Sequence, residues 1–190
     1  PLLAELRAKK VAIVPTLSLI EAFFRGDDHP ALLKDPVLVK SEPPFLLANL
    51  ATPAYRKAEF ERFGTVARID TNAWARKALP IMRANTMRMK KAGLLLGVGT
   101  DAGGPVGYNF QGFQTPREIE LLVDAGFTPM EALVAATKNG GIIAGRSDVG
   151  TLEPGKVADL LILDADPLAD ITNVRRIRTI VLGGVPYPRE

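Results

Sequence analysis

The chain has 190 residues, 47% of them hydrophobic, which is typical of one globular domain with at most a small appendage. Its net charge of +3 comes from interleaved acidic and basic residues, and no apolar run reaches the ~18 residues needed to cross a bilayer, so we expect no nucleic-acid and no membrane partner. The absence of cysteine excludes disulfides and thiolate metal sites.

The N-terminal part predicts a helix, a buried strand and a long surface excursion. Residues 2–10 have apolar residues on one face of a helix. Residues 11–17 (VAIVPTL) are β-branched and uncharged, as in a parallel strand covered on both faces, with Pro15 near the end of the strand. Residues 26–53 are rich in proline and charge, so we expect an irregular excursion with short helical pieces.

The middle of the chain predicts two helices and a second buried strand. The first helix opens at Thr52-Pro53 and runs toward Phe63. The second covers residues 72–92, with a kink at Pro80 and a cap at Gly93. Residues 94–99 form the second strand, and we expect it to lie parallel to the first.

Two copies of the pattern T-P-x-E then predict helix starts. Residues 115–118 and 128–131 each place threonine at the N-cap, proline at the first helical position and glutamate at the third, which is a capping box. Gly126 is expected to end the first of these helices, and either Gly140 or Gly145 the second.

The C-terminal part predicts a small β module. Its expected elements are a Pro-Gly turn at residues 153–156, a strand over 157–163, a polar loop over 164–170, a strand over 178–182, a tight turn at Gly183-Gly184 and a return strand over 185–187.

The main candidate for chemistry is Asp101, in LLLGVGTDAGGP (residues 94–105). An acid at the carboxyl end of a buried parallel strand is well placed as a metal ligand or a general base. The glycines after it let a substrate approach the backbone closely. The alternative is structural, since Asp101 is also the residue type that braces a following loop through its own backbone.

Other motifs compete with this interpretation. Residues 97–102 (GVGTDA) fit the dinucleotide fingerprint G-x-G-x-x-A, which requires a helix to begin inside the motif. A second candidate is the segment Asp27-Asp28-His29, which could bind a cation weakly or form a polar surface turn. The surface turn is the favoured interpretation. Because His29 is the only histidine, neither a three-ligand zinc site nor a Ser-His-Asp triad is expected from this chain alone.

Three segments of the chain resemble the C-terminal part of the amidohydrolase superfamily. In chain order they are GVGTDAGGP, TPREIELLVDAGFTPMEALVAATKNGG and VGTLEPGKVADLLILDADPLADI. The branch that the chain resembles most is that of the imidazolonepropionase-like and prolidase-like enzymes. The resemblance runs from about residue 2 to about residue 187 and is strongest from Gly93 onward.

The resemblance implies an α/β fold in two parts. Residues 1–146 would form the C-terminal portion of a (β/α)8 TIM barrel, about its last two strands and their helices, and residues 147–190 the C-terminal half of a small β-sandwich. Members of the family hydrolyse amide-type C–N bonds with one or two divalent metals, of which zinc is the one expected. Cyclic amides and dipeptide-like molecules are the implied substrates.

The resemblance also implies roles for residues. Asp101 matches the aspartate at the end of the eighth strand, which contacts the metal and takes a proton from the attacking water. The residues expected at the rim of the substrate site are Gly99, Thr100, Ala102, Gly103 and Gln111.

The sequence departs from the family pattern in lacking a His-x-His pair and in having Gln111-Gly112 where the family often has His-Gly. We therefore expect a piece of a longer hydrolase that is inactive and binds no metal alone, with the compartment open and the cytoplasm favoured. Two parallel strands cannot close a barrel, so a homo-oligomer or a missing N-terminal portion would cover the open edges. The alternative is a non-catalytic interaction or scaffold fragment.

Overall fold

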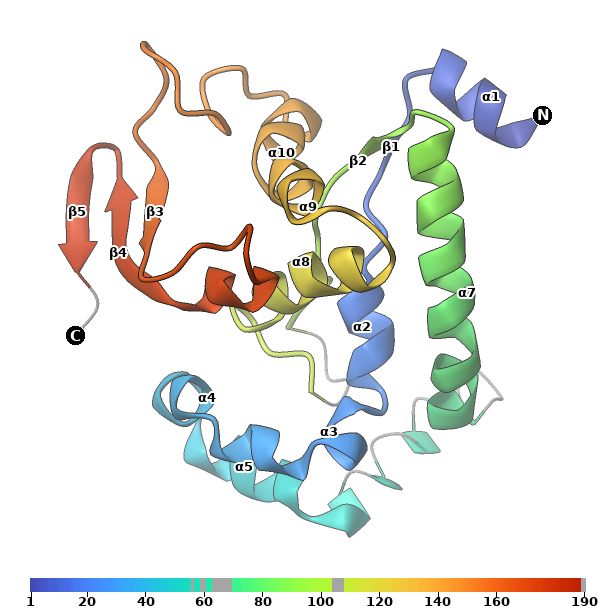
Figure 1. The fold of residues 1–190 in the computed structure, drawn as a ribbon. Helices are drawn as coiled ribbons and strands as arrows, with labels where there is room; N and C mark the ends of the chain where they lie inside the picture. The colour runs from blue at the N-terminus through green and yellow to red at the C-terminus, as the bar shows by residue number, and fades with distance from the viewer. Residues whose placement is uncertain (56, 59–60, 63–69, 104–107, 189–190) are drawn as a thin grey trace. The chain divides into compact units, whose positions relative to one another are not determined.

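The computed structural model describes residues 1–55, 57–58, 61–62, 70–103 and 108–188, which form a mixture of helices and short strands (Figure 1). The chain divides into two units. The first consists of residues 1–15, 83–99 and 116–190, and the second of residues 16–82 and 100–115. No helix within the described ranges is long and apolar enough to cross a membrane.

The first unit contains the predicted parallel strand pair, in a shorter form. After α1 (Leu2–Ala8), β1 (Ala12–Ile13) pairs in parallel with β2 (Leu95–Leu96). The prediction of a strand over residues 11–17 is wrong at its end, because Thr16 adopts a left-handed conformation and Leu17 is already helical. The strand expected over residues 94–99 is confirmed at its centre.

Three helices end at glycines: α7 (Thr71–Lys91) before Gly93, α8 (Gln114–Asp124) before Gly126, and α10 (Lys138–Ile143) before Gly145. Each glycine has a positive φ, and two N–H groups bond back to the last helical turn. After α7, for example, Gly93 donates to Lys90 O at 2.8 Å and Leu94 to Met89 O at 3.2 Å. This is the Schellman arrangement. It confirms the predicted ends at Gly93 and Gly126, while α7 continues through Pro80. The end predicted at Gly140 or Gly145 for the helix that opens at Thr128 is wrong, because that helix, α9 (Pro129–Ala136), already ends at Ala136 and Gly145 follows the separate helix α10.

One of the two predicted helix starts is confirmed. The Thr128 Oγ1 accepts from Glu131 N at 3.2 Å and Thr128 N donates to Glu131 Oε2 at 2.8 Å, so α9 (Pro129–Ala136) begins with a capping box. The start predicted with Thr115 as N-cap is wrong, because Gln114 N already donates to Phe110 O and α8 begins at Gln114, two residues before the predicted first helical residue, Pro116.

The predicted β module is a three-stranded antiparallel sheet in the order β3 (Leu160–Leu163), β4 (Ile177–Leu182) and β5 (Val185–Pro188). Gly183 and Gly184 have φ of +56° and +84°, as expected for a type I′ hairpin turn. The strand expected from residue 157 begins only at Leu160, because Val157 N donates to Asp148 O in the preceding loop. A short 3-10 helix, η2 (Ile171–Arg175), joins β3 to β4.

The second unit is more helical than the sequence indicates. The predicted excursion forms α3 (Arg25–Asp28), η1 (Pro30–Lys34), α4 (Pro36–Ser41) and α5 (Pro44–Ala51), after α2 (Leu17–Ala22). Three of these five helices (η1, α4 and α5) have a proline at the first or second helical position. A fourth, α2, has a left-handed residue, Thr16, at its N-cap. Residues 53–55, 57–58 and 61–62 are also helical, whereas the predicted helix end at Phe63 lies outside the described residues.

An aromatic cluster forms the core of this unit. Leu38 and Leu50 pack with Tyr108, Phe110 and Phe113, whose rings meet edge to face with centroids 6.3 Å and 6.4 Å apart. The Tyr108 ring lies so close to Gly26 that a Cβ there would be 1.6 Å from two ring carbons. A glycine in α3 is therefore required by the position of Tyr108.

We predict that Gly26→Ala destabilises the protein by about 1–3 kcal/mol or more, because the new methyl group overlaps a fully buried ring. Gly140→Ala, in α10, is the matched control. A Cβ at Gly140 meets nothing within 4 Å, so alanine should add up to about 1 kcal/mol through its helix propensity. Urea unfolding followed by circular dichroism measures both, and equal effects of the two substitutions would contradict the packing at Gly26.

Candidate functional site

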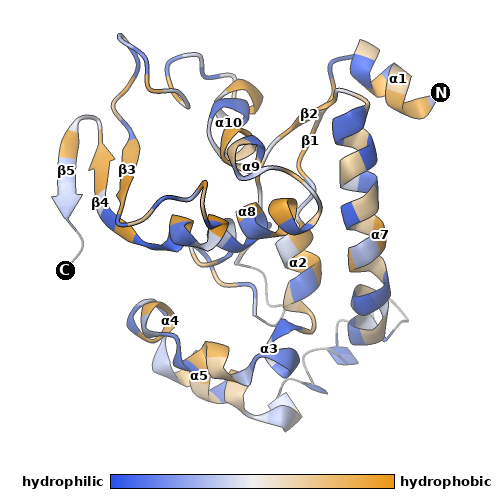
Figure 2. Ribbon diagram, viewed as in Figure 1, coloured by the Kyte–Doolittle hydropathy of each residue, from blue (hydrophilic) through white to orange (hydrophobic). Residues whose placement is uncertain are grey.

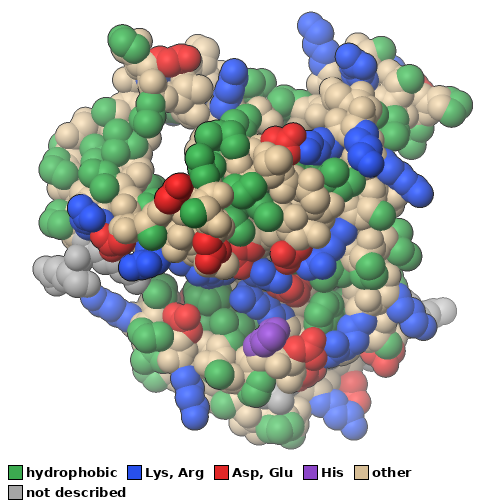
Figure 3. All heavy atoms as spheres, viewed as in Figure 1, with side chains coloured by type: hydrophobic (Ala, Val, Ile, Leu, Met, Phe, Trp, Pro, Cys, Tyr) green, Lys and Arg blue, Asp and Glu red, His purple; other side chains and the backbone are tan. Residues whose placement is uncertain are grey.

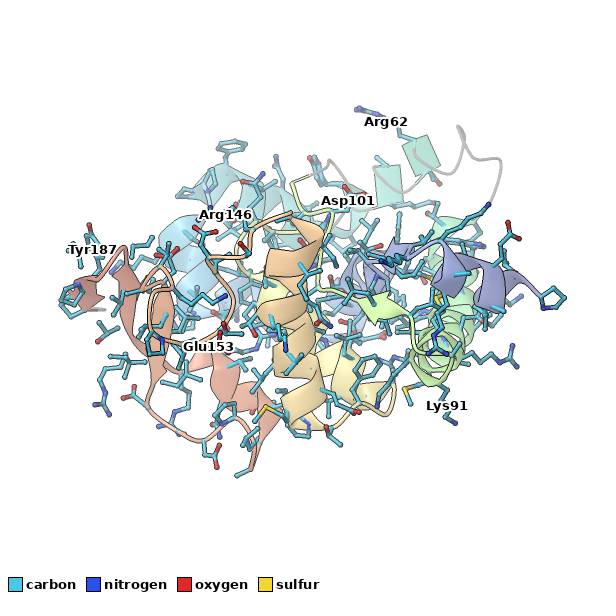
Figure 4. The ribbon with its side chains drawn as sticks, turned by 90° about the horizontal axis from the view of Figure 1, so that it is seen from above. Arg62, Lys91, Asp101, Arg146, Glu153 and Tyr187 are labelled. Carbon is cyan, nitrogen blue, oxygen red and sulfur yellow. The ribbon has the colours of Figure 1, made fainter. Side chains whose placement is uncertain are left out.

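Asp101 lies five residues beyond the end of β2, and its side chain is exposed (Figure 4). Its φ is +49°, in the left-handed region that non-glycine residues rarely adopt. Aspartate tolerates this region better than most residues, but the conformation still costs free energy. Backbone strain of this kind concentrates at functional sites, where the surrounding structure maintains it.

A neighbouring segment holds the backbone of Asp101. The Nδ2 of Asn109 donates to Asp101 O at 2.7 Å, and Gly103 N donates to Asn109 O at 3.2 Å. Ala102 N donates to the hydroxyl of Thr100 at 3.3 Å. These bonds use the backbone and leave the Asp101 carboxylate accessible. Asn109 is buried, and sequence reasoning misses its role because no local pattern predicts a contact with a residue eight positions earlier.

The structure brings some of the predicted rim residues together. A Cβ on Gly103 would lie 2.2 Å from Nε2 of Gln111, so the Gln111 side chain rests against Gly103. Thr100, Asp101, Ala102, Gly103 and Gln111 all belong to the second unit, whereas Gly99 is the last residue of a segment of the first. Gly104 and Pro105, which the sequence places in the same loop, lie outside the described residues. The contribution of each rim residue to substrate binding stays a prediction.

The dinucleotide interpretation is wrong, because no helix begins within residues 97–103. The two glycines of the motif have a packing explanation instead. A Cβ at Gly97 would be 2.5 Å from Cδ1 of Ile143, and one at Gly99 would be 2.4 Å from Cγ1 of Val14. They are the small residues that let these side chains pack on the segment after β2.

Asp27, Asp28 and His29 lie at the surface, as favoured, but the two aspartates end helix α3 and do not form a turn. Both Asp28 oxygens accept from the Arg76 guanidinium, at 2.7 Å and 2.9 Å, and Asp27 accepts from Asn72 at 2.9 Å. The hydrogen bond from Arg76 lowers the pKa of the Asp28 carboxyl below its ordinary value. Figure 3 shows the chain's one histidine at the surface among charged side chains. The two carboxylates are engaged by α7 rather than converging on His29.

The residues present do not fit a divalent metal by themselves. Over the part of the chain that the structure describes, no group of three or more His, Cys, Asp or Glu side chains could hold a metal ion. Asp101 offers one carboxylate, and a catalytic zinc normally needs three protein ligands.

Comparison with known proteins identifies relatives of this sequence. Residues 53–186 match the model of the amidohydrolase family. Imidazolonepropionase from Salinispora tropica is 37% identical over 106 residues, which is 54% of this chain and 26% of that protein. Ochratoxinase from Aspergillus niger is 37% identical over 86 residues, which is 43% of this chain and 16% of that protein. The chain thus matches about a quarter of such relatives or less.

Solved structures match almost the whole chain. A Xaa-Pro dipeptidase with bound methionine in its active site has a TM-score of 0.65 at 18% identity, covering 98% of this chain and 37% of that one. The ochratoxinase of A. niger has a TM-score of 0.57 at 21% identity, covering 97% and 34%. At these identities the likeness concerns the fold alone, and it establishes a mixed α/β arrangement shared with part of each structure.

We predict that glycine is better tolerated than alanine at position 101. Because φ there is positive, Asp101→Gly should be more stable than Asp101→Ala by roughly 1 kcal/mol. Lys77, exposed in the middle of α7, provides the control, since Lys77→Gly should be less stable than Lys77→Ala by about the same amount. The order of the four midpoints in urea is the measurement. The same order at both positions would show that Asp101 is not held in the left-handed conformation.

Proposed function

Because the chain belongs to the amidohydrolase family, we propose that it is the C-terminal part of an enzyme that hydrolyses amide-type C–N bonds. The observation that carries the proposal is Asp101, a strained and exposed carboxylate just beyond a parallel strand. Of the substrates, we favour cyclic amides or dipeptide-like molecules. The first class is in keeping with the similarity to imidazolonepropionase, and the second with the fold likeness to a Xaa-Pro dipeptidase.

We also propose how the fold is divided. Residues 1–146 would supply the last two strands of a TIM barrel with their helices, which the parallel pair β1 and β2 supports. Residues 147–190 would supply the C-terminal half of a β-sandwich, supported by the antiparallel sheet of β3, β4 and β5. A barrel needs further strands, and the matching segments span only 37% of the Xaa-Pro dipeptidase chain and 26% of the imidazolonepropionase.

In this proposal Asp101 is the general base. Its carboxylate accepts a proton from the attacking water and passes it to the leaving nitrogen. Asn109 positions it by holding its backbone carbonyl, and Thr100, Ala102, Gly103 and Gln111 form the rim. The family generally uses divalent metals, but Asp101 alone does not make a metal site. Further ligands would have to come from outside these 190 residues, so the isolated chain should be inactive.

A second candidate function is that of a scaffold or interaction fragment. Leu161, Ile180 and Tyr187 form a row across β3, β4 and β5, and they are 54%, 42% and 57% exposed. Figure 2 shows β3 in the colour of hydrophobic residues along its length. Exposed apolar side chains in such a row favour association. The outer strand β5 has prolines at positions 186 and 188, which lack the N–H needed for pairing, so the face of the sheet is the better contact surface than that edge.

We predict that the isolated 190-residue chain self-associates through this sheet face. Multi-angle light scattering at micromolar concentration should give a mass above 20.5 kDa, and Ile180→Lys should shift it toward the monomer. Lys77→Glu, on exposed α7, controls for a general effect of charge. A sharp monomer peak for the unmutated chain would contradict the prediction.

For the enzyme itself, we predict that Asp101→Asn lowers the turnover of the longer parent protein by roughly 10²–10⁴-fold. Folding should be retained, because asparagine adopts a positive φ at least as readily as aspartate. Asp166→Asn is the matched control, since Asp166 is exposed and its acceptor role toward Leu168 N survives in the amide. Amine release from dipeptide and cyclic amide substrates is the readout. Near-normal turnover of Asp101→Asn would remove Asp101 from the mechanism.

A further inference from the structure

Three non-glycine residues have a positive φ over the described ranges: Lys10, Thr16 and Asp101. Lys10 has a structural explanation. Its N–H donates to Arg7 O at 3.0 Å and Val11 N donates to Leu6 O at 2.9 Å, so Lys10 occupies the glycine position of a Schellman motif after α1. Thr16 and Asp101 have no such explanation.

Thr16 is the more unusual of the two. Its φ and ψ are +49° and +45°, and a β-branched side chain is a genuine outlier in the left-handed region. The residues that follow are Leu17 and Ser18, both almost completely buried, and they fix the backbone at this point. The fold thus maintains a conformation that the threonine side chain opposes.

Along the chain, Thr16 and Asp101 each follow the carboxyl end of one strand of the parallel pair. Thr16 follows β1 by three residues and Asp101 follows β2 by five. Parallel strands direct their carboxyl ends to one edge of a sheet. Val14 packs against Gly99, and each of these residues lies two positions before Thr16 or Asp101. Both strained residues belong to the second unit.

The Thr16 hydroxyl is not used for local structure. Threonine at an N-cap normally accepts a hydrogen bond from the first helical turn, yet Thr16 makes no such bond to α2. The Thr16 side chain is half-buried, so part of it is open to solvent. It therefore remains available to a ligand.

From this combination we infer that Thr16 is a second residue of the site around Asp101, and that its hydroxyl donates a hydrogen bond to an oxygen of the amide substrate. The inference rests on the proposed function. It assigns Thr16 to substrate binding and leaves proton transfer to Asp101.

The test uses the longer parent protein and the same amide substrates. Thr16→Val, which keeps the shape and removes the hydroxyl, should raise KM about tenfold or more with kcat changed less than about threefold. Thr16→Ser keeps the hydroxyl and should bind almost as the unmutated protein does. Thr52→Val is the control, because the Thr52 hydroxyl only donates to Ala48 O within an exposed helical turn.

Two further variants separate the possible outcomes. Thr16→Gly removes both the strain and the hydroxyl, so it should raise Tm and raise KM as Thr16→Val does, and it serves where Thr16→Val fails to fold. An unchanged KM in Thr16→Gly overturns the inference. Asp101→Asn in the same assay tests the proposed function on its own. If Asp101→Asn is inactive while the Thr16 variants bind normally, only the role of Thr16 is wrong.

Discussion

The parallel pairing of β1 with β2 is the constraint on which the candidate site depends. It involves only two residues in each strand, so side chains around it must hold the two segments together. Val14 packs on Gly99 and Ile143 on Gly97, and the Asn139 Nδ2 donates to Leu96 O at 2.7 Å. These contacts need glycine at both positions. They also decide where the chain leaves the sheet, and therefore where Thr16 and Asp101 begin their loops.

Just beyond the two strands, two residues adopt backbone conformations that lower the stability of the folded protein. Asp101 and Thr16 both adopt left-handed conformations, and the structure maintains them through neighbours. Asn109 holds the carbonyl of Asp101, and the buried residues after Thr16 fix its backbone. Strain that costs stability and leaves polar groups accessible is more typical of a binding or catalytic site than of a structural turn. Asn109 bonds to the backbone carbonyl of Asp101 and not to its carboxylate, and the Asp101 side chain is exposed.

Much of the local structure follows from the sequence, because glycine, proline and capping residues act over a few positions. Gly93, Gly126 and the capping box at Thr128 were predictable for this reason. The pattern at Thr115 shows where such local prediction fails. The hydrogen bond from Gln114 N to Phe110 O starts α8 before the position that the pattern predicts. The helices of residues 25–51 and the part played by Asn109 depend on packing with residues far along the chain, around Tyr108 and Asp101, which no local pattern encodes. The position of Asp101 after a strand is enough to predict it as a candidate site residue. The left-handed conformation of Thr16 is not predictable in this way, because residues 11–17 have the composition of a strand.

We propose that this chain contributes Asp101 to a hydrolytic site that residues outside these 190 complete. The most direct test is to measure amide hydrolysis by the 190-residue chain and by the longer parent protein at equal molar concentration, each supplied with Zn²⁺. We expect hydrolysis by the longer protein alone. Comparable hydrolysis by the isolated chain would contradict the claim that the site is incomplete, and hydrolysis by neither would contradict the assignment as part of an amide hydrolase.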